Sequence, residues 1–139
     1  MDRTRLDAIL DQLIPANPAK GIPAAGDFGT GGYVEEQAQR DEDLGTALAT
    51  LLKRAGELAD GGITPSVVRQ LETELPTEFS KLLVTTYMGY YSRPEIRALV
   101  GVGAHPVHPL GYAVAPEPPE LIAALTAPVR ARGKAYRDA

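Results

Sequence analysis

The sequence predicts an all-α fold. Apolar residues recur at three- and four-residue spacing along most of the chain, and Gly/Pro clusters separate these periodic segments. No segment alternates apolar and polar residues for more than a few positions, so we expect no extended strands. We therefore expect about six or seven helices around one core in a single domain, residues 1–139, with a long Gly/Pro-rich loop and an extended aromatic arm.

The first element expected is a helix from about residue 4 to residue 14. Its apolar positions are Leu6, Ile9, Leu10, Leu13 and Ile14. Asp2 or Thr4 is a candidate N-cap, and Pro15 should end the helix because the residue before a proline is pushed out of the α region. Residues 15–32 then read as a long surface loop. Its glycines do not form a phosphate-binding loop, because no Lys-Ser/Thr pair follows them and no strand is expected before them.

Three helices are expected in the middle of the chain. A short one covers about 33–40, and a longer one follows Asp43, a candidate N-cap, and ends before Gly61-Gly62. Thr64-Pro65 has the capping residue and first-turn proline typical of a helix start, and Val67, Val68 and Leu71 supply the apolar face of that helix.

The next helix restarts at Pro76. We expect its apolar face to comprise Phe79, Leu82, Leu83, Thr86, Tyr87 and Tyr90. Ser92 and Glu95 have the spacing of a capping box for a short helix that ends near Val100-Gly101. After the arm, Pro119 or Glu120 opens a last helix, which Pro128 is expected to interrupt before a basic tail.

Composition excludes several classes of function. The net charge is −4 and no basic stripe is present, which argues against nucleic-acid binding. The chain has no cysteine, so disulfides, thiolate metal sites and a cysteine nucleophile are excluded. No apolar run approaches the roughly 20 residues of a membrane span.

The stretch Thr85–Tyr112 is the best candidate for function. It contains four of the six tyrosines and both histidines. His105 and His108 each precede a proline in an extended segment, so their rings need not converge on a metal. Ser80 or Ser92 could be combined with either histidine on paper, but no nucleophile-elbow pattern supports such a pair. We expect no catalytic, cofactor-binding or metal-binding residue in this chain.

Aromatic residues at the end of the helix that starts at Pro76 have two open interpretations. Tyr87, Tyr90 and Tyr91 could pack in the core, or they could form a surface that another protein covers, since tyrosine offers a large contact area with a polar group. The arm from Val102 to Tyr112 has few ways to hydrogen-bond within itself, so it must lie on something, and Tyr112 is its candidate anchor.

Three segments resemble the gluconate 2-dehydrogenase subunit 3 family. They are LDAILDQLIPA at the start, TTYMGYYSRPEIRALVG in the middle, and the Pro-x-Gly-Tyr of Pro109–Tyr112. The resemblance covers about residues 6–112 and leaves 119–139 as an additional C-terminal helix and basic tail. It implies a small helical subunit with no cofactor of its own, which binds and helps to mature a large FAD-dependent sugar or polyol dehydrogenase of the glucose–methanol–choline oxidoreductase type.

This resemblance has consequences for partners and location. A cytochrome c subunit could complete the complex. Members of the family often carry a twin-arginine export signal, but Arg3 and Arg5 are not adjacent and no apolar region follows them. As written, the chain is expected in the cytoplasm, or in the periplasm if a leader was removed or is carried by a partner. Candidate partner-binding residues are Tyr87, Tyr90, Tyr91, Arg93, His105, His108 and Tyr112.

Two alternatives from other classes remain. The chain could be a free-standing binding module for another protein, or for a small sugar-like ligand stacked on Tyr87, Tyr91 or Tyr112. It could also be a metal-dependent enzyme that uses His105 and His108.

Overall fold

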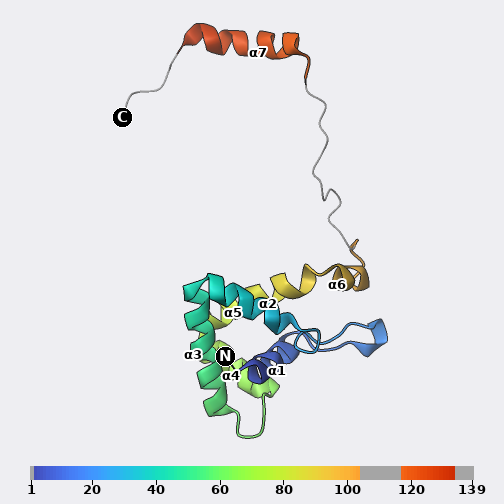
Figure 1. Ribbon diagram of the computed structural model, residues 1–139, viewed down its shortest axis with the longest axis vertical. Coiled ribbons are helices and arrows are strands. Elements are labelled where there is room, and N and C mark those ends of the chain that lie inside the picture. Colours follow the sequence, from blue (N-terminus) through green and yellow to red (C-terminus); the bar gives the residue numbers. More distant parts are fainter. Residues whose placement is uncertain (1, 104–116, 134–139) are drawn as a thin grey trace. The chain divides into compact units, whose positions relative to one another are not determined.

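The computed structural model describes residues 2–103 and 117–133. Within these ranges the chain forms seven α-helices and one short 3₁₀ helix, and its only strand-type pairing is an isolated bridge between Asn17 and Ile22, which confirms the all-α prediction (Figure 1). The elements are α1 (Arg3–Leu13), η1 (Pro18–Lys20), α2 (Thr30–Arg40), α3 (Glu42–Leu58), α4 (Pro65–Glu74), α5 (Pro76–Tyr91), α6 (Pro94–Leu99) and α7 (Pro119–Arg132). The chain divides into two units, Met1–Val107 and His108–Ala139.

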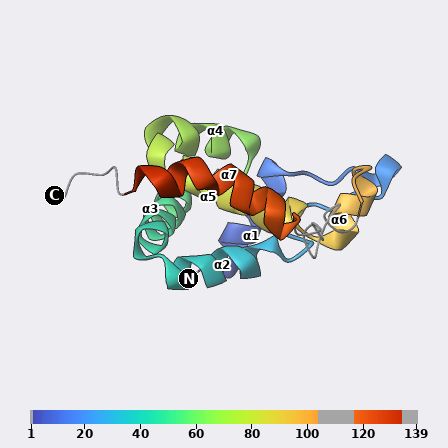
Figure 2. The ribbon, with the colours of Figure 1, turned by 90° about the horizontal axis from the view of Figure 1, so that it is seen from above.

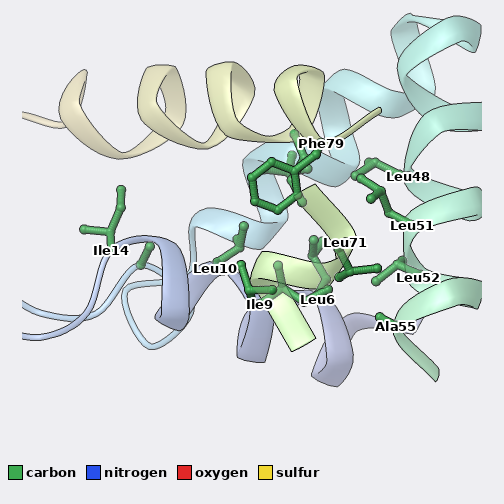
Figure 3. Packing of buried hydrophobic residues seen from close by; sticks show 14 of the residues in the cluster. Leu6, Ile9, Leu10, Ile14, Leu48, Leu51, Leu52, Ala55, Leu71 and Phe79 are labelled. Atoms are coloured by element: carbon green, nitrogen blue, oxygen red, sulfur yellow. The ribbon is translucent and has the colours of Figure 1, made fainter. Parts of the chain in front are cut away.

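The core of the first unit lies between α1, α2, α3, α4 and α5. Helix α3 packs against α1, α2, α4 and α5, and it crosses one end of α2 and α5 (Figures 1 and 2). Side chains from these helices point toward one another in the close-up of Figure 3, where the labelled residues are Leu6, Ile9, Leu10, Ile14, Leu48, Leu51, Leu52, Ala55, Leu71 and Phe79. Burying one large apolar side chain stabilises the folded state by about 1.5–3 kcal/mol relative to leaving it exposed. This cluster therefore supplies most of the free energy that favours folding.

Two of the expected helix starts have the caps that the sequence indicates. The Asp2 carboxylate accepts a hydrogen bond from the Arg5 backbone N–H (3.1 Å), and the Thr64 hydroxyl oxygen accepts one from Val67 N–H (3.4 Å). Helix α1 ends at Leu13, before Pro15, as expected.

Three other local predictions are wrong. The N-cap of α3 is Asp41, whose carboxylate accepts from the backbone N–H groups of Asp43 and Leu44. The N-cap of α6 is Arg93, so the capping box of Ser92 and Glu95 does not form. Helix α7 continues through Pro128 to Arg132 instead of being interrupted there.

The loop between α1 and α2 is tied to α1. The carboxylate of Asp11 accepts hydrogen bonds from the backbone N–H groups of Gly26 (2.7 Å) and Asp27 (3.1 Å), and Ala25 N–H donates to the Ile14 carbonyl (3.0 Å). A Cβ atom at Gly26 would overlap the backbone carbonyl oxygen of Asp7. This glycine is therefore required by close packing of two backbone segments.

Helix α2 begins at Thr30, three residues earlier than expected. Its first turn includes Gly31 and Gly32, which have low helix propensity. A side chain at Gly31 would overlap the Asp7 carboxylate and crowd the Arg3 guanidinium, which bridges Asp7 and Glu35. Tertiary contact with α1 thus overrides the local preference for a loop.

Helix α7 forms the described part of the second unit. Taken by itself, this described part of the unit has no buried residue in α7. Among the helices of residues 2–103 and 117–133, none is both long enough and apolar enough to cross a membrane.

Candidate partner-binding surface

Helix α5 is apolar on two sides. Its inner side packs into the core and comprises Phe79, Leu82, Thr86, Gly89 and Tyr90. Its outer side carries Val84, Tyr87, Met88 and Tyr91, which we call the outer stripe. Their positions follow the i, i+3, i+4, i+7 pattern of one helix face. The four side chains are 55, 43, 59 and 43% exposed, respectively.

This second stripe is unusual for a helix at the surface of an isolated domain. Such a helix normally presents one apolar face to the core and a polar face to water. Single exposed apolar residues need no explanation, but four aligned on one face form a candidate interaction surface.

The aromatic rings of the outer stripe are held in place from inside. Tyr90 is fully buried, and its ring packs edge-to-face against Phe28 (ring centroids 5.6 Å apart) and against Tyr91 (5.1 Å). Tyr91 in turn packs edge-to-face against Tyr87 (5.9 Å). This chain of rings runs from the core to the surface, so its contacts restrict the side-chain freedom of Tyr87 and Tyr91.

Tyr90 itself is not a surface residue, which corrects its assignment as a partner-binding residue. Its hydroxyl donates a hydrogen bond to the Pro23 carbonyl oxygen (2.5 Å), and burial, followed by the neighbouring Tyr91, raises the pKa of that hydroxyl. The predicted apolar face of α5 is confirmed at Phe79, Leu82, Thr86 and Tyr90, and it is wrong at Tyr87. Leu83 is half-buried and Tyr87 points outward, while Tyr90 lies on the buried face with Leu82 and Thr86.

Further apolar residues are exposed at the end of α6. Ile96 anchors this short helix in the core, whereas Leu99, Val100 and Val102 are exposed. The turn that follows is held by hydrogen bonds from Arg97 Nε to the Gly103 carbonyl (2.9 Å) and from Val102 N–H to the Arg97 carbonyl (3.0 Å). Exposed apolar residues therefore continue along the chain from α5 through α6 to Val102.

The remaining candidate residues divide into two groups. Arg93 is exposed at the junction of α5 and α6. His105, His108 and Tyr112 lie outside the described residues, as does most of the arm.

Sequence reasoning missed Val84, Leu99 and Val100. Val84 could have been found from its helical spacing to Tyr87, Met88 and Tyr91.

A shallow hollow of about 280 Å³ adjoins the outer stripe at Val84. It is lined by Asp41, Asp43, Leu44, Ser80, Lys81, Val84 and Thr85. Lys81 donates to the Asp43 carboxylate (2.5 Å), so an ion pair occupies its edge. The hollow is smaller than most small-molecule sites, and five of its seven lining residues are polar or charged. Within the ranges that the structure describes, no group of three or more His, Asp or Glu side chains could hold a metal ion.

Comparison of this chain with protein-family models, with curated proteins and with solved structures found no match.

Proposed function

We propose that this chain is a non-catalytic subunit that binds a large FAD-dependent sugar or polyol oxidoreductase through the outer stripe of α5. The observation that carries the proposal is the stripe itself: four exposed apolar side chains in helical register, two of them rings braced by the buried Tyr90. Pre-ordered tyrosines are favourable contact residues, because they bury a large area at a small entropic cost.

The resemblance supports the same part of the chain. The segment TTYMGYYSRPEIRALVG, its most specific part, spans Thr85–Gly101 and supplies Tyr87, Met88 and Tyr91 together with Leu99 and Val100. This motif is thus explained by two requirements, a buried tyrosine that supports the helix and an exposed face that meets a partner. The FAD and the chemistry belong to the partner, and the small subunit stabilises it. Val102 to Tyr112, including both histidines, would extend the contact.

The test is co-purification of the tagged full chain with the large flavoprotein, recorded by flavin absorbance and by the mass of the retained subunit. Met88→Lys should weaken the complex by about tenfold or more, because the charge would lose its hydration at the interface. The matched control is Thr73→Lys, which places the same charge in the last turn of α4 at an exposed position.

The two variants separate the possible outcomes. Retention of the flavoprotein by Thr73→Lys and its loss by Met88→Lys supports the stripe as the interface. Equal retention by both variants would mean that the interface lies elsewhere. Failure of the wild-type chain to retain any flavin-bearing protein would remove the proposed function.

A further inference from the structure

The turn between α3 and α4 contains the only Asp-Gly pair in the sequence, Asp60-Gly61. This turn comprises residues 59–64 and projects beyond the ends of the two helices in Figure 1. Asp60, Gly61 and Gly62 are exposed, and a Cβ atom built on either glycine would meet no atom of the described residues within 4 Å. The turn therefore offers an aspartate and a following backbone nitrogen with open space around them.

An Asp-Gly pair in this setting can rearrange without an enzyme. The Gly61 nitrogen attacks Cγ of the protonated Asp60 carboxyl group, a C–N bond forms and water leaves, which closes a succinimide ring. Water then adds to one of the two ring carbonyl carbons. Addition at Cγ restores aspartate, whereas addition at the main-chain carbonyl breaks the original peptide bond and leaves isoaspartate, in which the backbone runs through Cβ and Cγ. The rearrangement consumes no oxidant or reductant.

The attacking nitrogen is free in the folded chain. Among the described residues, the Gly61 N–H has no hydrogen-bond acceptor. The two preceding N–H groups are bonded, since Ala59 donates to the Ala55 carbonyl (3.0 Å). Asp60 N–H donates to the Leu58 carbonyl (3.2 Å). The hydrogen bonds that continue from α3 thus stop one residue before Gly61, and glycine adds no side chain that would crowd its nitrogen.

The other aspartates that the structure describes lack this combination. Five of the seven have carboxylates held by hydrogen bonds, namely Asp2, Asp7, Asp11, Asp41 and Asp43. Asp27 has no such bond within the described ranges, but the N–H of the next residue, Phe28, donates to the Ala24 carbonyl (2.9 Å). Of these seven, Asp60 alone combines an unbonded carboxylate, an unbonded following N–H and a following glycine.

We propose that Asp60 is a modification site, which isomerises to isoaspartate through a succinimide with Gly61 and then serves as substrate for an isoaspartyl carboxyl methyltransferase. Such an enzyme transfers a methyl group from S-adenosylmethionine. An oxygen of the freed α-carboxylate attacks the methyl carbon, the carbon–sulfur bond breaks, and a methyl ester forms. The first unit tolerates the change, because the nearest residues packed on its core, Leu58 and Ile63, flank the reacting pair. This site is independent of the proposed function.

The test incubates the full chain at neutral pH and follows isoaspartate over time. An isoaspartyl carboxyl methyltransferase with labelled S-adenosylmethionine measures the amount, and electron-transfer fragmentation in a mass spectrometer locates the residue. We expect isoaspartate to accumulate at residue 60. The rate should be similar in the folded chain and in the chain unfolded in urea, because the fold leaves the Gly61 nitrogen free.

Two variants isolate the reaction. Asp60→Glu keeps the charge, but its longer side chain would have to close a larger ring, so methyl acceptance at this position should be lost. Gly61→Ala keeps Asp60 and adds a side chain beside the attacking nitrogen, so the rate should fall several-fold. Gly61 has a φ outside the left-handed region, so alanine fits its backbone, whereas the same change at Gly62 (φ 120°) would be strained.

Three outcomes would overturn the proposal. One is the absence of isoaspartate at residue 60 of the wild type after prolonged incubation. Another is a rate in the folded chain far below that in urea, which would mean that the fold protects the pair. The third is an unchanged rate in Gly61→Ala, which would mean that the product does not arise by attack of that nitrogen.

Discussion

The Tyr90 side chain links parts of the chain that are far apart in the sequence. Its hydroxyl bonds to the Pro23 carbonyl, its ring packs on Phe28, and its other side supports Tyr91. The loop between α1 and α2 is thereby fastened to α5, and the outer stripe is supported from beneath. One buried residue thus contributes both to the fold and to the geometry of the candidate surface.

Removal of the Tyr90 hydroxyl tests this role. Tyr90→Phe keeps the ring but leaves the Pro23 carbonyl without its partner, so the free energy of unfolding should fall by about 1 kcal/mol. Tyr87→Phe, the same change at an exposed ring, should alter it by less than about 0.5 kcal/mol. Both values come from urea denaturation. Equal stability of the two variants would show that the Tyr90 hydroxyl does not hold the loop.

At the scale of single elements, α4 is tied to α3 by a charged cluster. The Arg54 guanidinium of α3 donates through Nε (2.6 Å) and through the second terminal nitrogen (3.1 Å) to the carboxylate of Glu74 in α4, and it also contacts Glu57. Gln70 donates a further hydrogen bond to Glu74 (2.7 Å). These bonds, first that from Arg54 and then that from Gln70, lower the pKa of Glu74 from its ordinary 4.5 to about 2.

The Glu74 pKa makes stability depend on pH in a defined window. Between about pH 4.5 and 2 the unfolded Glu74 takes up a proton while the folded one stays ionised, so the unfolded state binds more protons and stability rises with pH. The contribution is fully present above about pH 4.5 and disappears as the pH falls through 2. The cluster is exposed, so solvent screening keeps its contribution small.

Glu74→Gln should therefore flatten the acid limb of the stability profile. Its melting temperature should fall less than that of the wild type between pH 4.5 and 2, because no carboxyl remains to be protonated at this position. Glu72→Gln, on an exposed carboxylate of the same helix, is the control. If the wild type and Glu74→Gln lose stability in parallel, the contact between Arg54 and Glu74 does not contribute in solution.

At the scale of the whole molecule, burial is concentrated in the first unit. All of the buried core residues lie between Leu6 and Ile96, whereas α7 has none among the residues that the structure describes. We therefore expect the stability of the free chain to depend on the first unit.

The same substitution in the two units tests this division. Leu51 is 1% exposed and Leu125 is 69% exposed. Leu51→Ala should lower the free energy of unfolding by about 2–5 kcal/mol, because it leaves a cavity in the core. Leu125→Ala should change it by less than about 0.5 kcal/mol. Urea denaturation of the full chain measures both, and a comparable loss at Leu125 would contradict the division.

Local signals in the sequence determined much of this fold. Helical spacing, the caps at Asp2 and Thr64, and the breaks at Pro15 and Gly61-Gly62 predicted most helices, because each depends on residues within a few positions of one another. The same signals predicted a functional region around Tyr87, Tyr91 and Arg93, all of which are exposed. His105, His108 and Tyr112 lie outside the described residues, so the arm stays a prediction.

Only the tertiary structure decided which apolar side of α5 faces inward. Leu82, Leu83, Tyr87 and Tyr90 are all compatible with a buried face, and the choice depends on where α2, α3 and the loop at Pro23 and Phe28 make contact. The early start of α2 at Thr30 has the same cause, because a contact with α1 outweighs the low helix propensity of two glycines. Local preferences differ by about 1 kcal/mol or less per residue, whereas burying one large apolar side chain contributes more, so packing makes the final choice.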